Sequence, residues 1–372
     1  MNRVIYADNA ATTQMDSEAF EVYKNMMIEH YGNASQPYSF ARQNKKALKE
    51  AREIIAQCIN ADPDEIYFTS GGTESNNWVI KCAGDENKKT IITSKIEHHS
   101  VLNSCEAMQR EGFQVVYLPV NKQGIILKEK LNKNMTEDTK IISLMLANNE
   151  IGTVEPIKEL CEIAHARNVI FHTDAVQALG HIKIDVKELG VDLLSASAHK
   201  FNGPKGVGFL YIKKGTIIKP LHNGGKQEFG LRAGTEDVAS IFAMAIALKN
   251  NCENIQTSSE KLLSLENKII TYLDKNCVEY IRNGDFNHIP GNMSISFKNA
   301  SGEMLLHRLD LKGIMVSTGS ACDGNIDQIS HVIKSLNVQK EYREGTIRIS
   351  LGKNNTENEA EDIAKALVEI LK

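Results

Sequence analysis

Short apolar runs alternate with longer amphipathic stretches as far as about residue 255. The short runs are often β-branched, which is typical of buried strands, and they cover Glu65–Thr69, Thr90–Thr93, Gln114–Pro119, Lys140–Leu146, Val169–Thr173, Asp192–Ser195 and Gly208–Ile212. The clearest helical pattern is Glu155–Asn168, which has Pro156 near its start and an apolar face of Ile157, Leu160, Cys161 and Ala164. This alternation predicts an α/β domain with a mostly parallel sheet, in which ligands bind at the carboxyl ends of the strands.

The pattern changes after about residue 255. Three helices and two strands are indicated there: Lys261–Asn276, Glu303–Leu311 and Thr356–Leu371 as helices, and Asn292–Phe297 and Thr346–Leu351 as strands. Thr356 followed by Glu359 fits a capping box at the start of the last helix. These elements predict a second, smaller α+β domain.

Composition excludes several classes of protein. The chain has 372 residues, of which 42% are hydrophobic and 24% charged, as expected of a globular protein with a full core. The net charge of −4 without a basic block argues against nucleic acid as the primary partner. No apolar run approaches the roughly 20 residues that span a bilayer, and the N-terminus lacks a signal peptide, so we expect a cytoplasmic protein. The seven cysteines are scattered, which argues against a disulfide framework and a cysteine-based zinc site.

The segment at residues 192–208 places a lysine where a buried strand gives way to a tight loop. Lys200 follows His199 directly, and a Gly-Pro-Lys-Gly turn closes the segment. Burial favours the neutral, nucleophilic amine, so Lys200 is suited to form a Schiff base with pyridoxal phosphate. The same residues also fit a surface lysine in a turn, and both interpretations stay open at this point.

Other strand ends carry further candidate chemistry. Gly71, Gly72 and Thr73 follow a strand and open a helix, which suits a phosphate but is also common in plain turns. Asp174 ends the strand at 169–173, where it would pair with a pyridinium nitrogen or, alternatively, cap the next helix. Gln177 is close enough in sequence to reach the same pocket.

Two histidines stand beside another strand end. His98 and His99 are adjacent and therefore point to different sides, so they do not form an obvious metal pair. One of them would stack on an aromatic cofactor. The alternative is a capping or surface histidine.

The loop Ser317–Gly324 holds Cys322 among small polar residues, where an exposed thiol can present a reactive sulfur. The alternative is a loop cysteine of no consequence. Arg348 lies within an apolar strand, where it would bind a substrate carboxylate or form a salt bridge with an Asp or Glu of the protein.

The order of these motifs is more specific than any one of them. From Tyr6–Thr13 (YADNAATT) to Ile347–Gly352, the chain also carries Phe68–Asn77 (FTSGGTESNN), Thr93–His98, Asn148–Gly152 (NNEIG), His172–Gln177 (HTDAVQ), Ser197–Gly208, Arg232–Thr235 (RAGT) and Gly319–Cys322 (GSAC). Together they resemble the cysteine desulfurases, pyridoxal-phosphate enzymes of aminotransferase class V. The length of the GSAC loop resembles the long-loop NifS/IscS-like group.

The resemblance implies an α/β, aspartate-aminotransferase-like fold (fold type I) with a mostly parallel central sheet. It implies a large cofactor-binding domain at 16–255, and a small α+β domain at 1–15 and 256–372 that carries a catalytic-cysteine loop at about 317–330. No metal site is expected.

The resemblance also implies a role for each candidate residue. The catalytic residues would be Cys322 as the sulfur-accepting nucleophile, Lys200 as the cofactor lysine and proton carrier, and His98 stacked on the ring. The residues binding pyridoxal 5′-phosphate would be Gly72, Thr73, His98, Asn149, Asp174, Gln177, Ser197, His199, Lys200 and, toward the partner's cofactor, Thr235. The residues binding the substrate carboxylate would be Asn33, Asn149 and Arg348.

The implied reaction removes sulfur from L-cysteine to give L-alanine and a persulfide on Cys322. The persulfide would pass to a protein acceptor for iron–sulfur cluster assembly or for tRNA or other thiolation, and the enzyme would be a homodimer. No direct contact with nucleic acid or membrane is expected. An aminotransferase or selenocysteine lyase of the same fold, and a binding protein that has lost catalysis, stay open as alternatives.

Three departures from the family pattern stand out. Phe229 occupies the place of a usual arginine, and Asp323–Gly324 replaces the usual Thr-Ser or Thr-Ala after the cysteine. A carboxylate beside the thiol should raise the pKa of Cys322. The chain ends at Lys372, without the extension that some long-loop members use to dock a scaffold. This favours a dedicated thiolation partner, or a scaffold bound elsewhere.

Overall fold

This computed structural model describes residues 4–319 and 329–372. Its largest sheet has seven strands in the order β2-β8-β7-β6-β5-β3-β4. Their bounds are β2 Ile66–Thr69, β3 Thr90–Ser94, β4 Gln114–Leu118, β5 Thr139–Ser143, β6 Ile170–Asp174, β7 Leu193–Ser197 and β8 Gly208–Ile212. β8 runs antiparallel to both of its neighbours, and the other pairs are parallel. The prediction of a mostly parallel sheet is confirmed.

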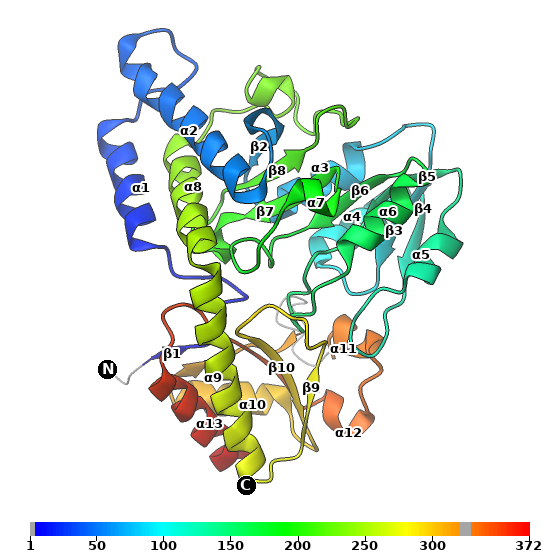
Figure 1. Cartoon of the computed structure of the whole chain (residues 1–372), viewed down its shortest axis with the longest axis vertical. Helices are drawn as coiled ribbons and strands as arrows, with labels where there is room; N and C mark the ends of the chain where they lie inside the picture. Colours follow the sequence, from blue (N-terminus) through cyan, green and yellow to red (C-terminus); the bar gives the residue numbers. More distant parts are fainter. Residues whose placement is uncertain (1–3, 320–328) are drawn as a thin grey trace.

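Helices cover both faces of this sheet (Figure 1). Their bounds are α1 Ser17–Glu29, α2 Arg42–Ile59, α3 Gly72–Cys82, α4 His99–Arg110, α5 Lys128–Asn134, α6 Ile157–His165, α7 Val186–Leu189 and α8 Val238–Glu253. Short 3₁₀ turns are η1 Ser39–Ala41, η2 Pro63–Glu65, η3 Ala198–Lys200 and η4 Glu228–Gly230. Successive strand residues pack on opposite faces, because side chains alternate along a strand. Leu193 meets the core of α3 and α4, whereas Leu194 meets that of α2, α6 and α8.

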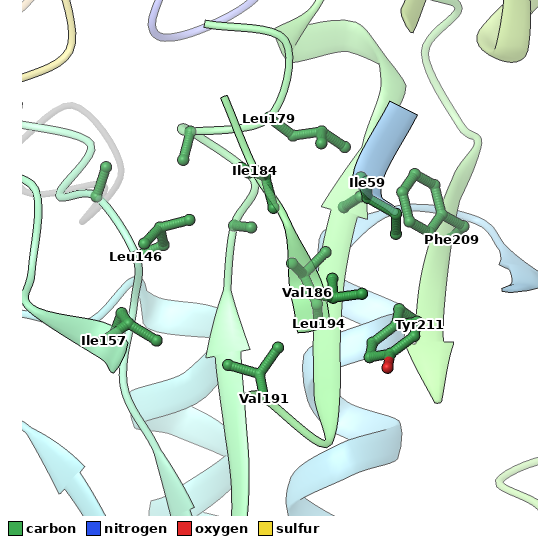
Figure 2. Packing of buried hydrophobic residues seen from close by; sticks show 14 of the residues in the cluster. Ile59, Leu146, Ile157, Leu179, Ile184, Val186, Val191, Leu194, Phe209 and Tyr211 are labelled. Atoms are coloured by element: carbon green, nitrogen blue, oxygen red, sulfur yellow. The ribbon is translucent and has the colours of Figure 1, made fainter. Parts of the chain in front are cut away.

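Figure 2 shows part of the larger core. Leu194, Phe209 and Tyr211 extend from β7 and β8 towards Ile59 of α2 and Val186 of α7. All five are at most 2% exposed. Burying apolar side chains of this size stabilises the fold by about 1.5–3 kcal/mol each. This packing fixes the sheet, and with it the strand ends that line the pocket described below.

The remaining strands form a three-stranded antiparallel sheet and a two-stranded parallel one. The elements are β1 Ile5–Tyr6, α9 Ile255–Lys275, β9 Tyr280–Asn283, β10 Asn292–Phe297, α10 Gly302–Leu311, β11 Ile314–Met315, α11 His331–Ser335, α12 Lys340–Arg343, β12 Thr346–Ser350 and α13 Glu357–Leu371. β1 pairs with β11, so the start of the described chain joins this second region. In Figure 1, α9 continues downward from α8 and connects the two regions.

Most elements expected from the sequence are present with small changes in bounds. β8 and β10 begin and end where the pattern placed them, and the capping box of Thr356 and Glu359 is confirmed. The strand expected at 140–146 ends early at Ser143, because the next residues leave the ladder while remaining buried. The helix expected at 261–276 begins earlier, at Ile255, since its polar first turn hides the apolar spacing. In the described part of the chain, no helix is long and apolar enough to cross a membrane.

Candidate active site

A pocket of about 490 Å³ lies where the carboxyl ends of β6 and β7 face β12 of the small sheet. Ten of the residues expected from the sequence line it: Gly72, Thr73, His98, Asn149, Asp174, Gln177, Ser197, His199, Lys200 and Arg348. They come from segments spread over most of the chain. The fold therefore brings together what the sequence could only place in order.

Three expected site residues are not among those lining the pocket. Asn33 is exposed and accepts a hydrogen bond from the Ser35 amide at 2.8 Å, and Thr235 is exposed on the surface. Cys322 lies outside the described residues. Ser317, Thr318 and Gly319, just before it in sequence, do line the pocket.

The first turn of α3 forms one wall of the pocket. Gly71, its N-cap, has φ +140°, a conformation that only glycine adopts freely. A Cβ atom on Gly72 would lie 2.6 Å from Cγ2 of Val176, so glycine is needed for this close approach. The first amide groups of a helix carry partial positive charge, and Ser197 and His199 line the same pocket. This wall is suited to an anion.

His199 contributes a neutral side chain to that wall. Burial lowers the pKa of His199 to about 4, and the nearby charges of Lys200 and Lys205 act in the same direction. Nδ1 of His199 lies 3.2 Å from Oγ1 of Thr12, which holds the ring in place. At neutral pH the imidazole therefore binds through hydrogen bonds and not through charge.

A buried carboxylate lies deeper in the pocket. Asp174 is 5% exposed, and its Oδ2 accepts a hydrogen bond from Nδ2 of Asn76 at 2.7 Å. Its Oδ1 accepts from the Val176 amide at 2.9 Å, which closes a turn and does not cap an α-helix. The alternative that Asp174 caps the next helix is therefore wrong, because the turn that it closes is not an α-helix.

His98 is linked to Asp174 through two other side chains. Nδ2 of Asn76 also donates to Oγ of Ser100 at 2.8 Å, and that hydroxyl lies 2.8 Å from Nδ1 of His98. The same Nδ1 accepts the Ser100 amide, so a neutral His98 carries its proton on Nε2. Burial lowers the pKa of His98, and the Asp174 carboxylate opposes that effect. His98 thus both caps α4 and lines the pocket.

Lys200 follows the end of β7 in the short turn η3. Its Nζ donates to the carbonyl oxygens of Ala10 at 2.6 Å and Ala11 at 2.9 Å. Nε2 of Gln177 donates to the same Ala10 carbonyl at 2.8 Å. The amine is therefore held inside the pocket by the segment after β1, and the interpretation of Lys200 as an ordinary surface lysine is wrong.

Arg348 approaches from the opposite side, on β12. Its Nη2 forms a salt bridge with Oδ1 of Asp8 at 2.7 Å, and its Nη1 donates to the Asn149 carbonyl at 2.9 Å. This is the protein salt bridge that the sequence left open. Nε is buried and has no hydrogen-bond partner within residues 4–319 and 329–372. Nε is therefore the nitrogen of this guanidinium that takes part in neither contact.

The segments on either side of Cys322 are tied to the pocket rim. Oγ of Ser330 donates to Oε2 of Glu150 at 2.6 Å, and Nε2 of His331 lies 3.0 Å from the carbonyl oxygen of Glu97. The rings of His99 and His331 are 4.8 Å apart. Residues just before and just after the cysteine in sequence thus lie at the pocket.

Sequence reasoning missed three residues of the site: Asp8, Asn76 and Ser100. Asp8 and Asn76 lie inside motifs that were recognised, but nothing there indicated their partners. Asn76 is 1% exposed although it is polar and lies within a helix. A buried amide side chain needs hydrogen-bond partners, and this need could have indicated that Asn76 belongs to the site.

Comparison with known proteins agrees with this geometry. The family described as aminotransferase class-V matches residues 5–363. The chain is similar to the cysteine desulfurase IscS of Dictyoglomus turgidum, at 46% identity over 100% of this chain and 96% of that protein. It is also similar to the cysteine desulfurase IscS of Clostridium botulinum strain Kyoto, at 44% identity over 100% and 95%. A solved NifS-like protein superimposes with a TM-score of 0.93 at 37% identity, covering 99% of both chains.

Proposed function

Because the chain belongs to the cysteine desulfurases of aminotransferase class V, we propose that it converts L-cysteine to L-alanine and places the sulfur on Cys322. The substrate sulfur leaves its carbon and bonds to the Cys322 sulfur, while the carbon gains a hydrogen. One cysteine and one thiol thus give one alanine and one persulfide, with no outside oxidant. Cys322 lies outside the described residues, so its part rests on the family pattern.

The residues of the pocket fit pyridoxal 5′-phosphate, which membership of class V implies. The α3 N-terminus with Thr73, Ser197 and His199 would hold the phosphate, and Asp174 would hold the ring nitrogen. His98 would stack on the ring, Gln177 would bond the ring hydroxyl, and Lys200 would supply the amine. When bound, the cofactor supplies an electron sink for cleavage of bonds at the substrate α-carbon.

Residues of this chain are placed to transfer the α-proton and to bind the substrate carboxylate. Lys200, released from the cofactor by substrate, would take the α-proton on Nζ and return it. Arg348 and Asn149 would bind the substrate carboxylate, with the unpartnered Nε of Arg348 as an additional donor. The lowered pKa of His98 would keep its ring neutral against the cofactor.

The observation that carries this proposal is the shared pocket. Lys200 and Asp174 come from the large sheet, Arg348 comes from the small one, and the residues preceding Cys322 line the same space. An aminotransferase needs the first three but has no use for a thiol there. The cysteine segment therefore favours desulfuration over transamination.

The test is to incubate the purified enzyme with L-cysteine and measure alanine, sulfide and protein-bound persulfide. We expect Cys322→Ala to lose persulfide and most sulfide release while keeping the bound cofactor. Cys277→Ala, which removes an exposed thiol, is the matched control and should behave like the wild type. Full sulfide release by Cys322→Ala would refute the persulfide route, and formation of 3-mercaptopyruvate when a 2-oxo acid is supplied as amino acceptor would indicate transamination.

We also propose that the enzyme is a homodimer. The surface of α1 and the segment after it expose large apolar side chains, including Phe20, Met27 and Ile28 at 50–58% and Tyr31 at 76%. Apolar surface of this extent marks interaction sites. Thr235 is exposed, as the expected contact with the partner's cofactor requires. Light scattering should give a dimer, and Ile28→Asp should weaken it; a monomeric wild type would contradict this proposal.

The two largest buried clusters support division into a large domain at 16–255 and a small domain at 1–15 and 256–372. A smaller cluster joins the two across this boundary, with Ile96, Met145 and Ile151 on one side and Val332, Ile333 and Leu336 on the other. The persulfide would pass in the cytoplasm to a protein acceptor for iron–sulfur assembly or for thiolation of tRNA or another molecule. Pull-down with persulfide-loaded enzyme, followed by mass spectrometry, would identify the acceptor.

A further inference from the structure

Two cysteines from distant parts of the sequence lie together away from the pocket described above. Cys58 is the penultimate residue of α2, and Cys252 is the penultimate residue of α8. Both are free and half-buried, and both pack against the core of the large sheet. The packing of α2 on α8 therefore brings together two thiols that the sequence keeps far apart.

The two thiols are close enough for each to shift the ionisation of the other. The neighbouring Cys252 thiol and burial raise the pKa of Cys58 far above that of an ordinary thiol. The neighbouring Cys58 thiol lowers the pKa of Cys252, against the opposing effects of burial and of Glu253. Cys252 is thus the more readily ionised member, and Cys58 stands beside it as a second thiol.

Solvent reaches this pair. Both cysteines line a pocket of about 590 Å³, together with Lys183 and Lys249. This pocket shares no lining residue with the one that holds Lys200. The charge of Lys249 lowers the pKa of Cys58, whereas Glu253, which lines the same pocket, raises the pKa of both thiols. A small polar oxidant can therefore reach a thiol that is primed to react.

We propose that Cys58 and Cys252 form a redox-active dithiol, which a hydroperoxide converts to a disulfide between α2 and α8. The Cys252 thiolate attacks one peroxide oxygen, the O–O bond breaks, and one water leaves with a sulfenic acid on Cys252. The Cys58 thiol then attacks that sulfur, and the S–S bond forms as a second water leaves. Two thiols lose two electrons in all, and one hydrogen peroxide is reduced to two waters.

The position of the pair gives the disulfide a structural consequence. Asn254, two residues after Cys252, has φ −113° and ψ 10° and separates α8 from α9. α9 carries the chain into the small sheet (Figure 1). A bond from Cys252 to Cys58 would tether this junction to α2 and close a long loop, which stabilises the folded state against the unfolded one.

The experiment uses full-length protein carrying Cys322→Ala, so that the proposed catalytic thiol contributes nothing. Reduced protein, freed of reductant, is treated with hydrogen peroxide and digested without reduction. We expect a Cys58–Cys252 cross-linked peptide by mass spectrometry, the loss of two titratable thiols, and a higher midpoint of thermal unfolding. Dithiothreitol should reverse all three. The non-reduced protein should show no chain-to-chain cross-link in a denaturing gel.

Matched variants make the result decisive. Adding Cys58→Ser or Cys252→Ser should abolish the cross-link and the rise in midpoint. Cys82→Ser, which removes another half-buried thiol, should leave both unchanged. The proposal is overturned if peroxide leaves both thiols reduced, or converts them only to sulfinic or sulfonic acids. If a serine variant does not fold, thiol counting and peptide mapping on the Cys322→Ala protein alone still decide the question. Desulfurase activity enters none of these readouts, so the outcome is independent of the proposed reaction.

Discussion

The two sides of the pocket are built differently. On the side of the large sheet, Asp174, Asn76, Ser100 and His98 form one continuous chain of hydrogen bonds. On the side of the small sheet, Arg348 is held by Asp8 and by a backbone carbonyl, and its Nε has no partner in the part of the chain that the structure describes. Hydrogen bonds between side chains join the first side before any ligand binds, and only Oδ1 of Asn76 within that chain lacks a partner among the described residues. On the second side, the nitrogen without a partner belongs to the cationic guanidinium of Arg348 itself.

This difference matches the proposed roles. A resident cofactor is bound through every turnover, so groups fixed in advance bind it without a repeated cost of ordering. A substrate carboxylate enters and leaves, and a buried donor without a partner favours its arrival because the unpaired state is costly. The first three of the following predictions test this contrast, from the largest expected effect on the enzyme to the smallest, and the fourth concerns stability.

Replacing Lys200 should have the largest effect. Lys200→Ala removes the amine of the cofactor side, and we expect alanine production to fall by about 10³-fold or more. The absorbance of the lysine–cofactor bond, near roughly 400–420 nm, should disappear. Lys205→Ala changes an exposed lysine of the same turn and should leave both measurements unchanged. Retained activity in Lys200→Ala would mean that another group carries the proton.

Replacing Arg348 tests the substrate side. Arg348→Ala should lower kcat/KM for L-cysteine by about a hundredfold, as expected for a lost charged contact worth ~2–3 kcal/mol. The effect should appear mainly in KM, while the affinity for the cofactor stays the same. Arg308→Ala, at an exposed position on α10, is the control. A matching loss of cofactor affinity would show that the two sides are not separate.

Replacing Asn76 tests the connected side. Asn76→Ala removes the donor that Asp174 and Ser100 share, and we expect pyridoxal phosphate to bind about tenfold more weakly. KM should change less than it does in Arg348→Ala. Asn77→Ala, which alters the half-buried neighbour bonded to the Thr73 carbonyl, is the matched control. Equal effects of the two asparagine variants would argue against a positioning role for Asn76.

The last prediction concerns stability and not turnover. Burial raises the pKa of Glu97 from an ordinary value of 4.5 to about 8. Between these values the folded protein keeps a proton that the unfolded chain releases, so the free energy of unfolding falls as pH rises. One such proton changes the free energy of unfolding by at most about 1.4 kcal/mol per pH unit. Above about pH 8 the stabilisation that comes from the protonated Glu97 is lost in full.

Glu97→Gln should therefore flatten the decline of stability between about pH 4.5 and 8, measured by urea unfolding at each pH. Glu106→Gln, at an exposed position on α4, should leave the slope as it is. An unchanged slope in Glu97→Gln would show that this carboxyl is ionised in the folded protein. Activity near neutral pH should change little, since Glu97 does not line the pocket.

Much of the fold was predictable, because local spacing reports which residues are buried. The apolar face of α6 and the capping box of α13 appear as expected. The errors fall where a mostly polar first turn begins a helix, as after Ile255, or where buried backbone leaves the sheet, as after Ser143. In both places tertiary packing sets the boundary of the helix or strand, and the spacing of hydrophobic residues does not indicate it.

The sequence by itself determined the order of the motifs, the class of chemistry and most of the residues that line the pocket. The order of the motifs can be recognised in the sequence because each strand that leads into the pocket is followed by a polar residue of its own. Only the tertiary structure decided how those residues are paired: Asp8 with Arg348, and Asn76 with Asp174 and Ser100. It also brought Cys58 and Cys252 together in a second pocket. Each pairing depends on the distance and direction between elements far apart in the chain. These are set by the packing of strands and helices, and no local pattern of residues encodes them.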